Sequence, residues 1–113
     1  MLRGEGFYRI VYTGAAGGSG FGLLAFETNQ VYGVDGAGIR YLGDYSLDQQ
    51  TLRASIELTI PAGVWLVTGQ PAAAVERKIT VQIAAPRAGG VVTFQTSLGP
   101  INAVLEKIGD FPS

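Results

Sequence analysis

Three aspartates in the middle of this 113-residue chain, Asp35, Asp44 and Asp48, have the residue type that could do chemistry. Together they could hold a divalent cation, and two of them could act as an acid–base pair. Their spacing does not match a calcium-binding loop, and Asp35 stands directly before Gly36, where an aspartate commonly accepts a hydrogen bond from its own turn. We therefore expect Asp35 to serve a turn and the other two to be solvated, and we assign no catalytic residue, metal ligand or cofactor.

The composition removes most other catalytic arrangements. The chain has no cysteine and no histidine, which excludes disulfides, thiolate metal sites and the Ser-His-Asp and Cys-His arrangements. A formal net charge of -1 and a pI near 5.2 argue against binding nucleic acid through its phosphates. We therefore expect a protein that is not an enzyme and does not bind nucleic acid.

A glycine run between two apolar segments could be taken for a phosphate-binding loop; it consists of Gly17, Gly18, Gly20 and Gly22. Such a loop needs a following Lys-Ser/Thr pair or a regular glycine spacing, and a helix directly after it. The chain has none of these, because a strand pattern follows. The run therefore predicts a hairpin connection.

Alternation of apolar and polar residues, with many β-branched and aromatic side chains, predicts short strands separated by glycine-rich turns. Pro61 ends the most regular of them. Residues 64–68 could be a short strand or a covering segment, and residues 101–108 have a spacing that fits either a helix or a closing strand, of which we favour the strand. The pattern predicts one domain over residues 1–113, an all-β, small antiparallel β-barrel of seven to eight strands, with strands at 6–13, 21–28, 31–35, 39–45, 52–60, 77–84, 91–98 and 101–108.

The stretch from Gly33 to Tyr45 contains an Asp-Gly pair between two alternating segments. This is a strong hairpin signal, since both central residues of a type I′ turn need positive φ. The sequence therefore predicts a type I′ turn at Asp35–Gly38 and a tight link at Asn29–Gln30.

The first two strands are apolar on both faces, and only 15% of the residues are charged. An antiparallel sheet usually has one wet face, so a second apolar face suggests contact with another chain. We expect a homodimer whose interface includes Tyr8, Ile10, Tyr12, Leu24 and Phe26. The aromatic residues expected inside, where they either fill the core or line a cavity for a small hydrophobic ligand, are Phe7, Phe21, Tyr41, Trp65 and Phe94.

The N-terminal stretch lacks the apolar core and cleavage site of a signal peptide, and no apolar run is long enough to span a membrane. The expected location is cytoplasmic, without membrane association.

Several short motifs resemble the GrlR-like family, negative regulators of type III secretion and their relatives in bacteria. They are Gly6-Phe7-Tyr8-Arg9-Ile10, Gly20 with Gly22, Gly33-Val34-Asp35-Gly36, Tyr41-Leu42-Gly43-Asp44-Tyr45, and more weakly Val67-Thr68-Gly69 and Leu98-Gly99-Pro100. The resemblance implies an eight-stranded, lipocalin-like, dimeric barrel with an internal apolar cavity, which acts by binding a partner regulator.

The link after the fourth strand, strongly acidic in the regulator that gives the family its name, is the expected partner loop; it consists of Ser46, Leu47, Asp48, Gln49 and Gln50. In this chain Asp48 is the single carboxylate of the loop, which cannot form an acidic docking patch. The resemblance therefore predicts the fold of this chain better than it predicts its partner. Together these features predict a non-enzymatic, homodimeric module that binds a regulatory protein. The alternative is a carrier of a small hydrophobic ligand inside the barrel.

Overall fold

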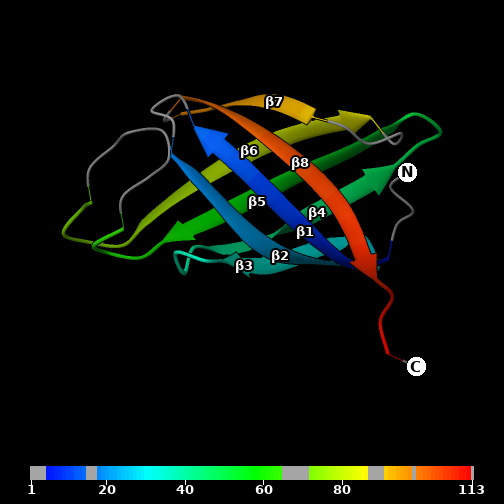
Figure 1. The fold of residues 1–113 in the computed structure, drawn as a ribbon, viewed down its shortest axis with the longest axis horizontal. Helices are drawn as coiled ribbons and strands as arrows, with labels where there is room; N and C mark the ends of the chain where they lie inside the picture. Colours follow the sequence, from blue (N-terminus) through cyan, green and yellow to red (C-terminus); the bar gives the residue numbers. More distant parts are fainter. Residues whose placement is uncertain (1–4, 15–17, 65–71, 87–90, 98, 113) are drawn as a thin grey trace.

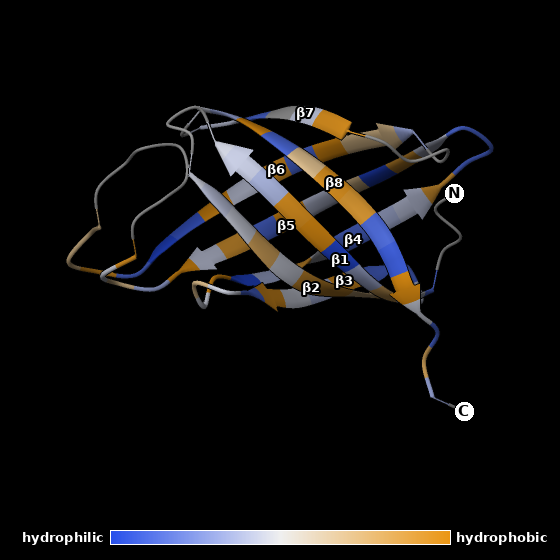
Figure 2. Ribbon diagram, viewed as in Figure 1, coloured by the Kyte–Doolittle hydropathy of each residue, from blue (hydrophilic) through white to orange (hydrophobic). Residues whose placement is uncertain are grey.

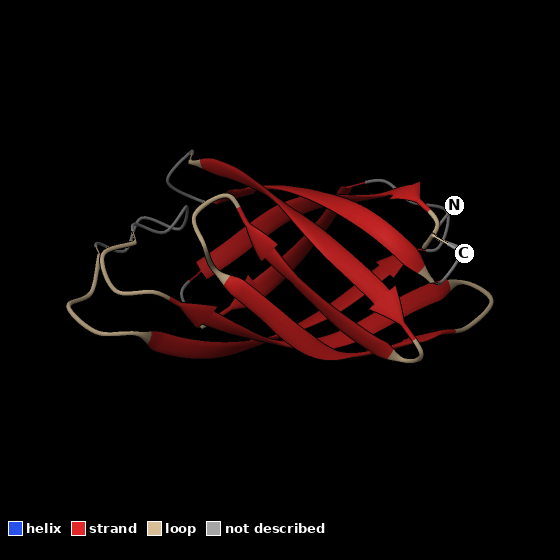
Figure 3. Ribbon diagram, turned by 90° about the horizontal axis from the view of Figure 1, so that it is seen from below, coloured by secondary structure: helices blue, strands red, loops and turns tan. Residues whose placement is uncertain are grey.

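Eight antiparallel strands form one continuous sheet that curls into a nearly closed barrel (Figures 1 and 3). This is a computed structural model, which describes residues 5–14, 18–64, 72–86, 91–97 and 99–112, without the side chain of Phe94. The strands are β1 (Gly6–Gly14), β2 (Ser19–Glu27), β3 (Gln30–Asp35), β4 (Arg40–Leu47), β5 (Thr51–Ile60), β6 (Arg77–Pro86), β7 (Val91–Thr96) and β8 (Gly99–Gly109).

The hydrogen-bonded order is β6-β5-β4-β3-β2-β1-β8-β7, so the chain meanders and then closes by pairing β8 with β1. The two end strands, β6 and β7, lie next to each other along the remaining seam (Figure 1). The predicted all-β barrel is therefore confirmed, and the last segment is a strand and not a helix. No helix in the described ranges is long and apolar enough to cross a membrane.

Alternate side chains of the strands point into the barrel and form its core. At the end where β1 begins, the ring of Phe26 lies 4.6 Å from that of Tyr8 and 4.8 Å from that of Tyr45, measured between centroids. Aliphatic residues fill the middle, and the fully buried side chains include Leu24, Val31, Leu52, Ile56 and Ile60.

The turn chemistry differs from the sequence prediction at two hairpins. Between β3 and β4 only Gly38 has a positive φ, +86°, and the loop is closed by hydrogen bonds from Asp35 N to Ile39 O and from Gly38 N to Asp35 O, each 3.0 Å. This is a three-residue loop that ends in a left-handed glycine, so the type I′ prediction was wrong. Two consecutive positive φ angles occur instead at Thr28 (47°) and Asn29 (65°), one residue before the predicted link.

Two glycines, Gly33 in β3 and Gly43 in β4, let neighbouring strands approach closely inside the barrel. A Cβ added at Gly43 would collide with the backbone of Ser55 and Ile56 on β5, and one at Gly33 would collide with the backbone of β2. Glycine inside a strand commonly marks such a bend or close approach.

We expect Gly43→Ala to lower the free energy of unfolding by about 3 kcal/mol, because backbone and not a flexible side chain must move. Gly109→Ala is the matched control, since an added Cβ there meets nothing within 4 Å and φ is not positive. Urea unfolding of both variants tests this, and equal losses of stability would contradict the close-approach explanation.

Candidate functional site

The side chains expected at a dimer interface lie inside the barrel. Tyr8, Ile10 and Tyr12 of β1 are at most 8% exposed, and Leu24 and Phe26 of β2 are 1% exposed. The interface assignment of these five residues was therefore wrong. Both faces of β1 and β2 are apolar, so alternation alone does not show which face of each strand turns inward. Assigning the wrong face to the interior moves every side chain of the strand to the wrong side of the sheet.

The residues expected to line a cavity are affected by the same reversal. Phe21 is 65% exposed on the outside of β2, and Phe7 lies on the outside of β1, where its ring packs edge-on against Phe111 at 4.9 Å. Both were therefore assigned to the wrong face, whereas Tyr41 is buried inside as expected. Trp65 and the side chain of Phe94 lie outside the described part of the structure.

One enclosed space lies among aliphatic side chains in the middle of the barrel, between Leu24, Leu52, Ile56 and Val92. Its volume is about 20 Å³. Pockets for small organic ligands measure about 300–1,000 Å³. A hydrophobic ligand would therefore not fit this space unless the surrounding side chains moved.

Asp35 is a charged residue that is buried in the described part of the barrel, 6% exposed, and its carboxylate has four hydrogen-bond donors. Its Oδ1 accepts hydrogen bonds from Ala37 N (2.9 Å) and Ile39 N (3.0 Å), which confirms that it serves its own turn. Its Oδ2 accepts hydrogen bonds from the hydroxyls of Tyr12 (2.6 Å) and Tyr41 (3.0 Å). Burial, together with the neighbouring carboxylate, raises the pKa of both tyrosines, so both hydroxyls keep their protons and donate.

Two glycines of the β1–β2 hairpin make room for this cluster. A Cβ at Gly20 would lie 2.6 Å from the ring of Tyr12, and one at Gly22 would lie 3.0 Å from Cβ of Asp35. The pairing of β1 with β2 confirms the hairpin interpretation of the glycine run. The tyrosine contacts of Asp35 were missed because nothing in the sequence pairs Asp35 with residues 23 and 6 positions away.

The expected partner loop is a compact turn between β4 and β5. Ser46 and Leu47 belong to β4, and Leu47 is partly buried against the core. The carboxylate of Asp48 accepts hydrogen bonds from Gln50 N (2.8 Å) and Thr51 N (2.7 Å). Its single carboxylate is therefore occupied by the turn itself, and Gln49 and Gln50 add two exposed neutral side chains.

The outside of the barrel carries a continuous apolar surface, here called the outer apolar face, which crosses the six neighbouring strands β7, β8 and β1–β4. One row follows paired positions across β7, β8, β1 and β2, and further pairs continue onto β3 and β4. Figure 2 shows hydrophobic segments on the adjacent strands β8, β1 and β2. The residues of the outer apolar face are 39–69% exposed; they are Val91, Val104, Val11, Phe21, Leu23, Val34, Tyr32 and Leu42.

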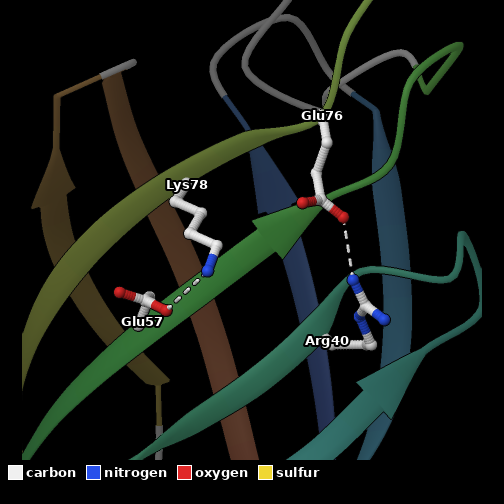
Figure 4. A network of polar contacts seen from close by, with 4 residues as sticks. All are labelled: Arg40, Glu57, Glu76 and Lys78. Atoms are coloured by element: carbon white, nitrogen blue, oxygen red, sulfur yellow. Dashed lines mark hydrogen bonds and ion pairs between the residues drawn. The ribbon is translucent and has the colours of Figure 1, made fainter.

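Charged residues at the border of the outer apolar face are neutralised within the chain. Arg9 forms a 3.1 Å ion pair with Glu106, and Arg40 forms a 2.9 Å ion pair with Glu76 (Figure 4). All four side chains are about half exposed or more, so these pairs contribute little to stability. These two ion pairs therefore leave no net charge at Arg9 and at Arg40.

The outside of β5 and β6 is polar by contrast. Lys78 and Glu57 approach to 3.7 Å there (Figure 4), and Gln82 donates a 2.9 Å hydrogen bond to Ser55. A shallow open groove of about 580 Å³ runs over this side and continues to Asp44 on β4. Among the described strands, β5 and β6 are therefore polar on the outside, in contrast to the outer apolar face.

The structure places this protein among small all-β proteins with a nearly closed antiparallel barrel. Compared with models of known protein families and with curated protein sequences, the chain matches none. The surface and the interior of this chain are therefore the features that bear on its function.

Proposed function

We propose that this protein is a non-enzymatic, homodimeric binding module in which the outer apolar face of one barrel packs against that of a second copy. The observation that carries the proposal is the extent of this face over six adjacent strands. A second copy would cover the four strands β1–β4, which extend about 14 Å around the barrel wall at a strand spacing of about 4.8 Å.

A second copy fits the charge pattern of the face. One row of paired positions runs from Arg9 at one border through Leu23 and Val34 to Arg40 at the other. A two-fold axis between Leu23 and Val34 would place the Arg9 end of one copy on the Arg40 end of the other. Because each arginine has its own glutamate, the two ends meet without net repulsion.

The energetics favour an interface over a free surface. Burying each large apolar side chain contributes about 1.5–3 kcal/mol when complete, before the cost of association is subtracted. The interior supports the non-enzymatic part of the proposal, since the carboxylate of Asp35 is held by four donors and the chain has no histidine or cysteine. The resemblance to GrlR-like regulators supports a regulatory role through a further protein partner.

We expect Val34→Lys to convert the dimer into a monomer, because it places a desolvated charge at the centre of the interface. Gln82→Lys adds the same charge to the polar side and should leave the dimer intact. Sedimentation equilibrium, referred to the chain mass of 11.8 kDa, measures the change. The dissociation constant should rise at least about 100-fold for Val34→Lys alone. Equal effects of the two variants would reject the outer apolar face as the interface.

A further inference from the structure

Arg77, the first residue of β6, lies at the end of the barrel that also contains Asp35. It pairs with Ile60, which is 1% exposed, and it shares its side of β6 with the buried or half-buried Ile79 and Val81. The guanidinium therefore lies on the inner side of the sheet. Two of its nitrogens, Nε and Nη2, are buried and have no hydrogen-bond partner among the residues that the structure describes.

This arrangement is unfavourable for an arginine that has only a structural role. A guanidinium cannot lose its proton in a protein, so it cannot relieve burial by becoming neutral. Arg77 as a whole is only half-buried, so the cost falls on the two buried donors that are left unsatisfied. No described residue of the chain supplies a partner for these two donors.

The nearby carboxylates are already used. Glu76, the adjacent residue in the chain, pairs with Arg40, and Asp35 accepts four hydrogen bonds from other donors. Neither forms an ion pair with Arg77 in the described structure.

The two unpartnered nitrogens also form a specific shape. Nε and Nη2 lie along one edge of the planar guanidinium, and this edge donates two parallel hydrogen bonds to the oxygens of a carboxylate or a phosphate. Both nitrogens are closed to solvent in this structure, so an oxyanion reaches this edge only when the side chains that cover it move apart.

We propose that Arg77 is the anchor of an oxyanion-binding site at this end of the barrel, which binds a carboxylate or phosphate group through Nε and Nη2. The site is separate from the outer apolar face and does not depend on dimer formation. Its ligand is a small molecule that carries such a group, or the free anion itself.

The test titrates the wild-type protein with sodium phosphate and, separately, sodium acetate, against sodium chloride at equal ionic strength. Binding is followed by the melting temperature and by isothermal titration calorimetry. We expect a saturable response to at least one oxyanion. Response to phosphate alone identifies a tetrahedral ligand, and response to acetate alone identifies a carboxylate. No saturable response to either one would overturn the proposal.

Variants separate the site from general salt effects, which also stabilise proteins. Arg77→Met should weaken oxyanion binding by about tenfold or more, and Arg77→Lys should weaken it less, because lysine keeps the charge but loses the two-pronged edge. Arg53→Met, at an exposed position on β5, should bind like the wild type. Without added oxyanion, Arg77→Met should melt no lower than the wild type. An unchanged affinity in Arg77→Met would overturn the proposal, and if that variant fails to fold, Arg77→Lys provides the comparison.

Discussion

Replacing Phe26 by aspartate is expected to leave no folded protein at 25 °C. The ring is 1% exposed and packs between those of Tyr8 and Tyr45. Removing such a ring costs about 3–5 kcal/mol, and a carboxylate in its place adds several kcal/mol of desolvation. The sum is comparable to the whole stability of a small domain.

Phe21→Asp is the matched control, since it makes the same change in the same strand. Phe21 is 65% exposed, so its replacement should change the free energy of unfolding of the monomer by no more than about 0.5 kcal/mol. Circular dichroism and urea unfolding at high dilution measure both variants. The reverse result, a folded Phe26→Asp and an unfolded Phe21→Asp, would mean that β2 faces the other way.

Replacing Asp35 by alanine is expected to lower the free energy of unfolding by about 4 kcal/mol. Four donors lose their acceptor at once: the two tyrosine hydroxyls and the backbone NH groups of Ala37 and Ile39. Each unsatisfied buried donor costs about 1–3 kcal/mol, although relaxation and water recover part of the sum.

Tyr12→Phe is the control for this prediction. It removes one donor and leaves the other three bonds to Asp35 in place, so its cost should be about 1 kcal/mol. Chemical unfolding of the two single variants and of the double variant gives the coupling between the side chains. A loss from Asp35→Ala no larger than that from Tyr12→Phe would show that the carboxylate does not organise this end of the barrel.

The positions of the strands could be predicted from the sequence because apolar and polar residues alternate regularly in them. Leu52, Ala54 and Ile56 alternate with polar residues, and all three are buried in β5. Turn residues were more difficult. The Asp35-Gly36 pair predicted a two-residue hairpin loop closed between Asp35 and Gly38. The loop is instead closed between Asp35 and Ile39, so it is one residue longer.

The inward face of β1 and β2 could not be predicted from these strands alone. Phe7 and Tyr8 are adjacent in the sequence and both aromatic, so either could have been the buried one. Tyr8 is the one inside, because of how β1 pairs with the other strands of the barrel. A weak signal was present in Arg9, which shares its face with Phe7 and Val11 and pairs outside with Glu106. A charged residue on one face of a strand favours the opposite face for the core.

The interior contacts were the least predictable part of the candidate sites. The Tyr12–Asp35 hydrogen bond reaches across β2 from β1 to β3, and the unpartnered edge of Arg77 depends on the side chains that the curled sheet packs around it. The spacing of residues within one strand carries no information about such contacts.

The central claim, that the outer apolar face joins two copies, is tested most directly by cross-linking. The chain has no cysteine, so Leu23→Cys introduces a single reactive thiol at the centre of the face, and Gln82→Cys introduces one on the polar side. A short bismaleimide should give a covalent dimer in high yield for Leu23→Cys and almost none for Gln82→Cys. Equal yields, or no dimer from Leu23→Cys at concentrations where Gln82→Cys sediments as a dimer, would contradict the account.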